Sequence, residues 1–208
     1  TEQYTQVFGG SNEGYNEIWW FYCSSSATNI DKYIVYNYVE NIWYYGSMAR
    51  SAWLDSGLRN FPLAATYNGV LVNHEEGIDD NETGTTAAIP SFITSAEFDL
   101  DDGHQFMLMS RVIPDVSFEG STAGAPAVDM TFFGLGSSGS GYNNPASESG
   151  VNTGTITRSA TSPVEVYTTQ VHTRVRGRQM SLKIESSATG VQWQLGAPRL
   201  DMRPDGRR

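Results

Sequence analysis

The sequence predicts an all-β protein built from antiparallel strands. Short runs rich in β-branched and aromatic residues recur along its 208 residues, each bounded by Gly, Asn, Asp or Ser, whereas helical periodicity with capping residues is hard to find. The hydrophobic content of 39% is enough for a buried core without disulfides, and Cys23 is the single cysteine. We expect a β-meander and linker over residues 1–89 and an antiparallel β-sandwich over residues 90–208.

The elements of the first part are strands and hairpins. Predicted strands cover residues 17–22, 33–39, 42–45, 64–67 and 70–72. The second and third strands meet through Glu40-Asn41, which indicates a hairpin. The last two flank Asn68-Gly69, a strong hairpin signal, because we expect both turn positions to need a positive φ. An acidic loop over residues 75–88 follows.

The second part begins with residues 96–101, whose alternation predicts one buried and one wet face. Residues 106–113 are apolar on both faces, which is typical of a central strand covered on both sides. A strand over residues 128–135 precedes a long loop over residues 134–157, rich in Gly, Ser and Asn. Loops of that length are usually functional or mobile.

Near the C-terminus the alternation of apolar and polar residues changes phase twice. Apolar or β-branched residues stand at odd positions over residues 171–175 and at even positions over residues 180–184. A change of phase needs an extra residue, so we expect a β-bulge at Gly177 within one long strand. The same device is expected at residues 196–198, between odd apolar positions 191–195 and even positions 200 and 202.

Motifs with catalytic or metal-binding chemistry are weak. Residues 134–139 fit G-x-G-x-x-G, but Asn144-Pro145 follows instead of a helix, which favours a loop. The acidic loop from Asp79 to Glu82 resembles the start of a calcium loop, yet its twelfth position is Pro90. A solvated turn is favoured there, with an irregular cation site as the alternative. The three histidines are far apart in sequence. We therefore expect no catalytic residue, metal or cofactor.

An aromatic block occupies the first part. It comprises Trp19, Trp20, Trp43, Trp53, Tyr22, Tyr33, Tyr36, Tyr38, Tyr44 and Tyr45. Packing between sheets is the favoured interpretation. The alternative is a platform on which sugar rings stack. Carboxylates such as Glu17, Glu40 and Asp55 could then hydrolyse the bound sugar, as in a glycosidase. The stretch Asp55-Ser56-Gly57 even echoes a sialidase-type propeller turn, although Trp53 and Asn60 depart from that motif.

Charge is unevenly distributed along the chain. Residues 1–157 hold 4 Lys or Arg against 19 Asp or Glu, whereas residues 158–208 hold 9 against 4, within a net charge of −10. The candidate interface or DNA-channel residues are Arg174, Arg176, Arg178, Arg199, Arg203, Arg207 and Arg208. Arginine suits ion pairs and phosphate contacts because its planar fork holds two acceptors. One interpretation of these arginines is an ordinary basic surface in contact with solvent. Head-to-tail packing of copies, with each basic patch on a neighbour's acidic face, is the favoured one.

Several segments resemble the C-terminal region of structural tail proteins of short-tailed bacteriophages, the nozzle or DNA-stabilising ring. They are residues 36–46 (YNYVENIWYYG), 174–180 (RVRGRQM), 193–201 (WQLGAPRLD) and 203–208 (RPDGRR). The resemblance implies a β-propeller, of which residues 7–46 look like one blade, and a chain that is the C-terminal piece of a longer protein.

The resemblance also implies a function. We expect a non-enzymatic virion protein, assembled in the host cytoplasm, that forms a ring-like homo-oligomer below the portal through which DNA passes. Its partners would be other tail or portal-adapter proteins and, transiently, packaged DNA. No membrane span is expected, since no apolar run approaches the roughly 20 residues required. The alternatives are a receptor- or glycan-binding β module built on the aromatic block and, third, a glycosidase.

Overall fold

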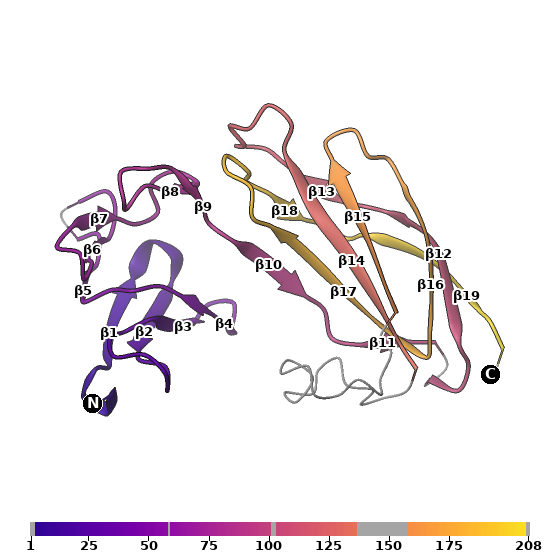
Figure 1. The fold of residues 1–208 in the computed structure, drawn as a ribbon, viewed down its shortest axis with the longest axis horizontal. Helices are drawn as coiled ribbons and strands as arrows, with labels where there is room; N and C mark the ends of the chain where they lie inside the picture. The colour runs from indigo at the N-terminus through magenta and orange to yellow at the C-terminus, as the bar shows by residue number, and fades with distance from the viewer. Residues whose placement is uncertain (1–2, 58, 101–102, 137–157, 207–208) are drawn as a thin grey trace. The chain divides into compact units, whose positions relative to one another are not determined.

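The computed structural model describes residues 3–57, 59–100, 103–136 and 158–206, and it is all-β with antiparallel sheets. Within these ranges the helical elements are two short 3-10 turns, and no helix has the length and apolarity that crossing a membrane requires. The chain forms two compact units (Figure 1). The N-terminal unit runs up to Gly77 and includes Glu82–Thr85, and the C-terminal unit comprises Ile78–Asn81 and Thr86–Arg208.

The N-terminal unit contains a four-stranded sheet, β1-β2-β3-β4, and a three-stranded sheet, β5-β6-β7. Its elements are η1 (Gln3–Thr5), β1 (Phe8–Asn12), η2 (Glu13–Tyr15), β2 (Glu17–Tyr22), β3 (Lys32–Asn37), β4 (Ile42–Ser47), β5 (Ala52–Leu54), β6 (Leu63–Ala65) and β7 (Leu71–Asn73). Both predicted hairpins are confirmed. In the second hairpin Gly69 alone has a positive φ, of 78°, so a single turn position rather than two favours glycine.

The aromatic block is divided between the two faces of the four-stranded sheet. Side chains alternate along β2, so Trp19 and Phe21 are buried, and they pack with Val35 and Ile30. Trp53 stacks on Trp19 with ring centroids 5.1 Å apart. The opposite face carries a second stack, in which Trp43 lies 5.7 Å from Trp20 and 4.5 Å from Tyr36. Packing therefore does not explain the whole block, because Trp43 is 60% exposed.

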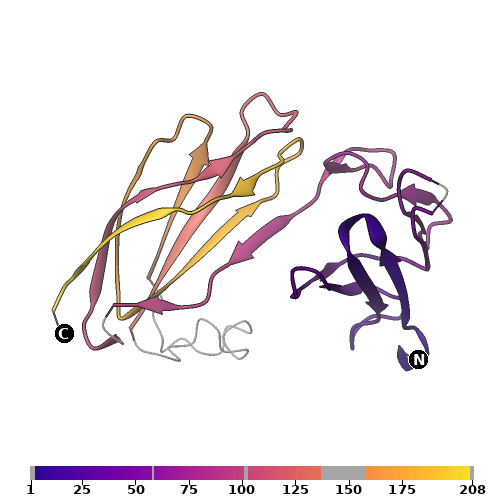
Figure 2. The ribbon, with the colours of Figure 1, turned by 180° about the vertical axis from the view of Figure 1, so that it is seen from behind.

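The C-terminal unit holds the remaining strands. They are β8 (Asp79–Asp80), β9 (Ala87–Ala88), β10 (Ser91–Thr94), β11 (Phe98–Asp99), β12 (Met107–Ile113), β13 (Val116–Ser117), β14 (Ala127–Leu135), β15 (Arg158–Glu165), β16 (Val171–Gly177), β17 (Gln179–Ser186), β18 (Gln194–Leu195) and β19 (Arg199–Pro204). One sheet has the order β10-β17-β14-β15, with β11 also on β17, and another has the order β16-β12-β19 (Figure 2). Buried side chains from both sheets form one hydrophobic cluster.

Residues 78–81 and 86–89, which the sequence analysis assigned to the first part, pack with this second unit. Strand β8 pairs with β9. The carboxylate of Asp79 also accepts the backbone N–H of Gly190, at 2.8 and 3.0 Å. These contacts join the start of the unit to its C-terminal half.

The bulge expected at Gly177 is wrong, because the chain changes sheets there. Strand β16 pairs with β12, whereas β17, which begins two residues later, pairs with β14. A Cβ atom on Gly177 would lie 2.6 Å from the carbonyl oxygen of Gln179 and 2.8 Å from the amide nitrogen of Leu135. Glycine thus permits two backbones to approach at the corner. The predicted buried sets on either side, Val171 to Val175 and Met180 to Ile184, are confirmed.

Strand β12 is central in its sheet, as predicted, but the described residues do not cover both of its faces, since Arg111 and Ile113 are exposed. The register with both neighbours shifts between Met109 and Arg111. This irregularity brings Val112 onto the buried face with Met107 and Met109, while Ile113 stays 38% exposed. The register shift explains why both odd and even positions of β12 are apolar, although the described residues form no second layer over its outer face.

The bulge expected at residues 196–198 is also wrong, because two separate strands, β18 and β19, flank this segment, but the arrangement differs from that at Gly177. Strands β18 and β19 pair with β13 and β12, which are themselves consecutive in the chain. The backbone and side chain of Asp115 accept the N–H groups of Gly196 and Ala197, each at 2.7 Å. The two kinked segments therefore stay beside each other.

Candidate functional site

The arginine-rich strands lie on one face of the β16-β12-β19 sheet. Along β16 the residues Val171, Thr173 and Val175 are buried, so Arg174 and Arg176 lie on the outer face. Along β19 the half-buried Leu200 and Met202 pack against the core, so Arg199 and Arg203 lie on that same outer face. The fold thus brings together two arginine pairs that are more than twenty residues apart in the sequence.

Strand β12 lies between these pairs and sets their spacing. Leu108 is the register partner of both Arg176 and Arg203. Because neighbouring strands lie about 4.8 Å apart, these two arginines are anchored about 10 Å from each other. Arg111 pairs in register with His172 on one side and Asp201 on the other. We define the basic face as the outer face of this sheet, with Arg111, Arg174, Arg176, Arg199 and Arg203.

Sequence reasoning missed Arg111, which lies outside the arginine-rich last quarter of the chain. Its carboxylate partner is Asp201, with 3.4 Å between Nη2 and Oδ2 and with both side chains about half exposed. An exposed ion pair of this kind contributes at most about 1 kcal/mol. The alternating pattern of β12 could have revealed Arg111 only if the register shift next to it had been known.

Arg176 and Arg178 make contacts within the unit. Arg176 donates from Nε to Asp205 Oδ2 at 2.6 Å, and Arg178 donates from Nη1 to the carbonyl oxygens of Gly103 and His104, both at 3.1 Å. The two guanidinium carbons lie 4.1 and 4.7 Å from the centre of the Phe106 ring. These cation–π contacts attach the ends of β16 and β12 to each other.

Arg174, Arg199 and Arg203 are exposed. Within the described ranges, none of the three makes an ion pair or a side-chain hydrogen bond with another residue. They therefore remain available to an external anion, and a guanidinium can hold a carboxylate or a phosphate through two parallel hydrogen bonds. Arg207 and Arg208, the last two candidates, lie outside the described residues.

A buried carboxylate network occupies the N-terminal unit. Glu17 accepts from Trp19 Nε1 at 2.9 Å, from Asn12 Nδ2 at 3.3 Å and from the Tyr44 hydroxyl. The same Asn12 amide donates to Glu75 Oε1 at 3.2 Å, which brings two carboxylates close together. Burial, followed by the charge of Glu17, raises the pKa of Glu75. Burial and the hydrogen bond to Glu17 raise the pKa of Tyr44.

This network has one feature of the glycosidase alternative, the paired carboxylates. Its hydrogen bonds, however, join β1, β2 and β4 to the segment after β7. Both oxygens of Glu17 already accept hydrogen bonds, so the described contacts give this carboxylate a structural role. Asp55 is likewise occupied: although burial raises its pKa, hydrogen bonds from Ser11 and from the backbone of Ser56 and Glu13 lower it overall.

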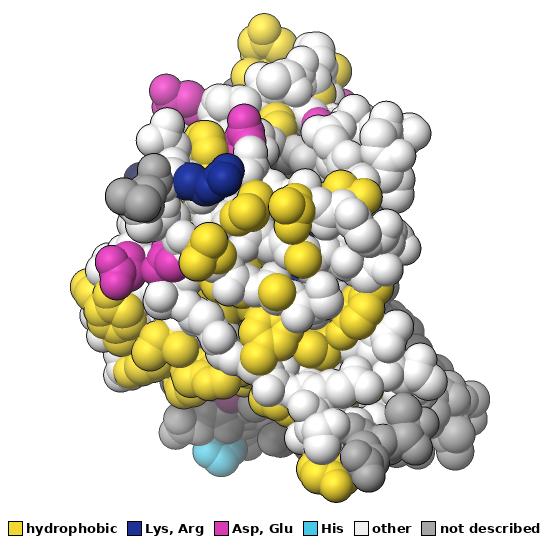
Figure 3. Space-filling model, turned by 90° about the vertical axis from the view of Figure 1, so that its left-hand side faces the viewer, with side chains coloured by type: hydrophobic (Ala, Val, Ile, Leu, Met, Phe, Trp, Pro, Cys, Tyr) yellow, Lys and Arg dark blue, Asp and Glu magenta, His cyan; other side chains and the backbone are white. Residues whose placement is uncertain are grey.

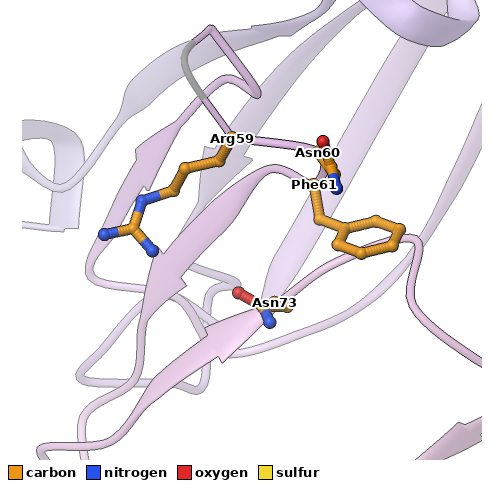
Figure 4. A pocket seen from close by; sticks show the side chains of 4 residues that line it. All are labelled: Arg59, Asn60, Phe61 and Asn73. Carbon is orange, nitrogen blue, oxygen red and sulfur yellow. The ribbon is translucent and has the colours of Figure 1, made fainter.

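An open depression of about 310 Å³ lies beside the β5-β6-β7 sheet. Its lining residues are Arg59, Asn60, Phe61 and Asn73, and the Arg59 and Phe61 side chains extend away from each other (Figure 4). None of the residues that the sequence analysis proposed for an interface lines it. With a single cation and no convergent polar set, it offers little to a specific ligand.

The acidic loop is divided between the units. Asp79 binds Gly190 in the C-terminal unit, whereas Glu82 pairs with Arg50 in the N-terminal unit at 2.8 Å. Within the described ranges, no group of three or more His, Cys, Asp or Glu side chains could hold a metal ion. His74 accepts from Arg50 Nε at 2.9 Å and packs against Trp53 with the two rings tilted by 50°. Of the glycine motif, Gly134 and Leu135 belong to β14 and residues 137–139 lie outside the described residues.

A comparison of the chain with protein-family models finds no match. A comparison with curated proteins likewise finds no match.

Proposed function

We propose that this chain is a structural subunit of the tail of a short-tailed bacteriophage, which forms a ring-like homo-oligomer below the portal through which DNA passes. The observation that carries the proposal is the basic face of the β16-β12-β19 sheet, where Arg174, Arg199 and Arg203 are exposed without partners among the described residues. The resemblance of residues 36–46 and of the arginine-containing segments to such tail proteins supports it.

The proposal includes a finer description of the fold. We interpret the two sheets of the C-terminal unit, which share one hydrophobic cluster, as a β-sandwich that supplies subunit contacts. The four-stranded meander β1-β2-β3-β4 is interpreted as one blade of a propeller. In this description the partners are further copies of the chain and neighbouring tail or portal-adapter proteins, and the protein is located in the virion without enzymatic activity.

Replacement of Arg174, Arg199 and Arg203 by Ser tests the proposal. All three side chains are exposed, so the variant should fold, with an unchanged circular dichroism spectrum. Multi-angle light scattering should show an oligomer for the unmodified chain and a monomer for the variant. The control is Arg59→Ser, which removes an exposed arginine from the N-terminal unit. An unmodified chain that stays monomeric, or a variant that assembles normally, overturns the proposal.

The passage of DNA through the ring is tested separately. If arginines of the assembled ring contact phosphates, binding of a DNA duplex should fall steeply as salt rises, because each contact releases counterions. Filter binding of the assembled protein at several salt concentrations measures the slope. Binding that is absent, or that does not change with salt, removes DNA from the proposal and leaves the ring.

A second candidate function is a receptor- or glycan-binding module. The observation that favours it is the exposed stack of Trp43 and Tyr36, because exposed aromatic faces suit sugar rings. Exposed hydrophobic side chains also gather on one face of the molecule with few charged side chains among them (Figure 3). Glycan-array binding that is lost on Trp43→Ala and kept on Tyr167→Ala, an exposed aromatic of the other unit, would support it. A blank array argues against it.

A further inference from the structure

The second sheet of the C-terminal unit carries the opposite charge on its outer face. Along β14 the residues Val128, Met130 and Phe132 are buried, so Asp129 lies on the outer face. The register places Glu185 of β17 directly beside Asp129, and Glu165 of β15 beside Ala127. Asp99 of β11 lies on the same face, next to Gln179. We define the acidic face as this surface, with Asp99, Asp129, Glu165 and Glu185.

The charges of the acidic face are mostly unpaired. Asp129 and Glu165 are exposed and make no ion pair with another described residue. Lys183 is the one basic side chain in the described register of this face, and it bonds Glu185 at 2.6 Å. The Glu185 side chain is still 44% exposed. The face therefore has an excess of negative charge. Two of its carboxylates belong to one row of register partners across the sheet, which consists of Phe92, Glu185, Asp129 and Pro163.

We propose that the basic face of one copy docks onto the acidic face of a second copy, an inference that rests on the proposed ring-forming function. The two faces belong to opposite outer surfaces of one unit, since both sheets turn their inner sides to the same hydrophobic cluster. A copy that uses its basic face thus keeps its acidic face for the next copy. Such a heterologous contact propagates, and it closes into a ring when the rotation per copy allows it.

The two faces match in their apolar content as well as in charge. Exposed Ile113 lies along β12, next to Arg199 in register, and exposed Phe92 lies next to Glu185. Apolar side chains surrounded by charged ones are the usual composition of a protein interface. Opposite charges on the two faces also set which face meets which, because contacts between like faces are repulsive.

A second copy of the chain provides partners for the charges of both faces, whereas DNA provides partners only for the basic face. Phosphates would be held by the exposed arginines, but the same phosphates would be repelled by Asp129 and Glu165 on the other sheet. The docked copy satisfies exposed arginines and exposed carboxylates in the same contact. DNA binding by the basic face is therefore the competing outcome in the experiment below.

The test uses two complementary variants of the full chain. The first neutralises the basic face by Arg174→Ser, Arg199→Ser and Arg203→Ser. The second neutralises the acidic face by Asp129→Asn, Glu165→Gln and Glu185→Gln. Each variant alone should be monomeric by light scattering. An equimolar mixture should give a complex with twice the mass of one chain and nothing larger, because one acidic face and one basic face remain to form a single contact.

The outcomes separate this inference from the function on which it rests. If the acidic-face variant assembles like the unmodified chain while the basic-face variant does not, the inference is overturned and the ring-forming function stands. Retention of DNA binding by that assembling variant would identify DNA as the occupant of the basic face. A monomeric unmodified chain overturns both. Neutralising Glu13 and Glu40, exposed acids of the N-terminal unit, is the matched control and should leave assembly unchanged.

Discussion

The Thr173 hydroxyl is buried on the core side of β16, and no described group forms a hydrogen bond with it. A buried polar group without a partner costs about 1–3 kcal/mol. Thr173→Val keeps the shape and removes the hydroxyl, so we expect the free energy of unfolding to rise by about 1 kcal/mol in urea denaturation. Thr131→Val is the control, since the Thr131 hydroxyl has a partner in Thr161 at 2.9 Å and no gain is expected. A Thr173→Val protein that is less stable than the unmodified chain would contradict the assignment of the Thr173 hydroxyl as buried without a partner.

Glu75 gives the N-terminal unit a pH dependence of predictable sign. Burial and the neighbouring Glu17 raise its pKa in the folded chain above the ordinary value of 4.5. The folded state then binds the proton more tightly than the unfolded state, so stability falls as pH rises from 4.5 through the raised pKa. Above that window the charged carboxylate costs the unit its full penalty.

Glu75→Gln removes the charge and keeps an oxygen that can accept from Asn12. We expect the variant to be more stable than the unmodified chain at pH 8 and equally stable at pH 4. Tryptophan fluorescence during urea unfolding measures this, because four of the five tryptophans lie in the N-terminal unit. Glu40→Gln, at an exposed position, is the control. A difference that does not change with pH would refute the coupling.

At the scale of elements, Gly177 is the position where the fold depends most on one residue type. Gly177→Ala places a Cβ against backbone atoms at 2.6 and 2.8 Å, so β16 and β17 must separate at the corner. We expect a loss of about 1–3 kcal/mol or more in the free energy of unfolding, as for other overpacked sites. Gly136→Ala is the matched control, since no atom of the described residues, its chain neighbours aside, lies within 4 Å of its Cβ position. Equal stability of the two variants would show that the corner is not tight.

The strands were more predictable than their assignment to sheets. Period-two patterns identified β16 and β17, because burial of one face produces an alternation of apolar and polar residues that is visible in the local sequence. The change of phase near Gly177 was correctly located, but the predicted bulge within one strand was wrong. Whether the chain then continues in one sheet or enters another depends on the contact of Gly177 with Leu135, which is more than forty residues earlier in the chain, and such a long-range contact is not visible in the local sequence.

The same limit applies to the candidate site. Arg174 and Arg176 could be placed on one face from alternation alone, but Arg111 and Asp129 could not. Arg111 follows a register shift in β12, and Asp129 faces outward beside Glu185, more than fifty residues away in the sequence. Packing between sheets is the wrong interpretation for Trp43, which is exposed. When both faces of a strand carry large side chains, the sequence does not distinguish the buried face from the exposed one.

For the whole molecule, the proposed contact between copies should depend on ionic strength. The Debye length falls from about 10 Å at 0.1 M salt to about 3 Å at 1 M, so exposed arginines and carboxylates attract each other less at high salt. We expect the average mass of the unmodified chain in light scattering to decrease as NaCl is raised over this range. Sodium sulfate at equal ionic strength serves as a comparison, because sulfate strengthens apolar association. A mass that is constant in NaCl would argue against an electrostatic contact.

The corner at Gly177 has a mechanical consequence. Strand β16 carries part of the basic face and β17 carries part of the acidic face, and a single residue, Arg178, separates them in the chain. In a closed series of copies, tension from one neighbour to the next would therefore pass through a covalent backbone instead of pulling two packed layers apart. A unit whose two sheets are connected in this way can transmit force between its neighbours without separation of the sheets that enclose its hydrophobic core.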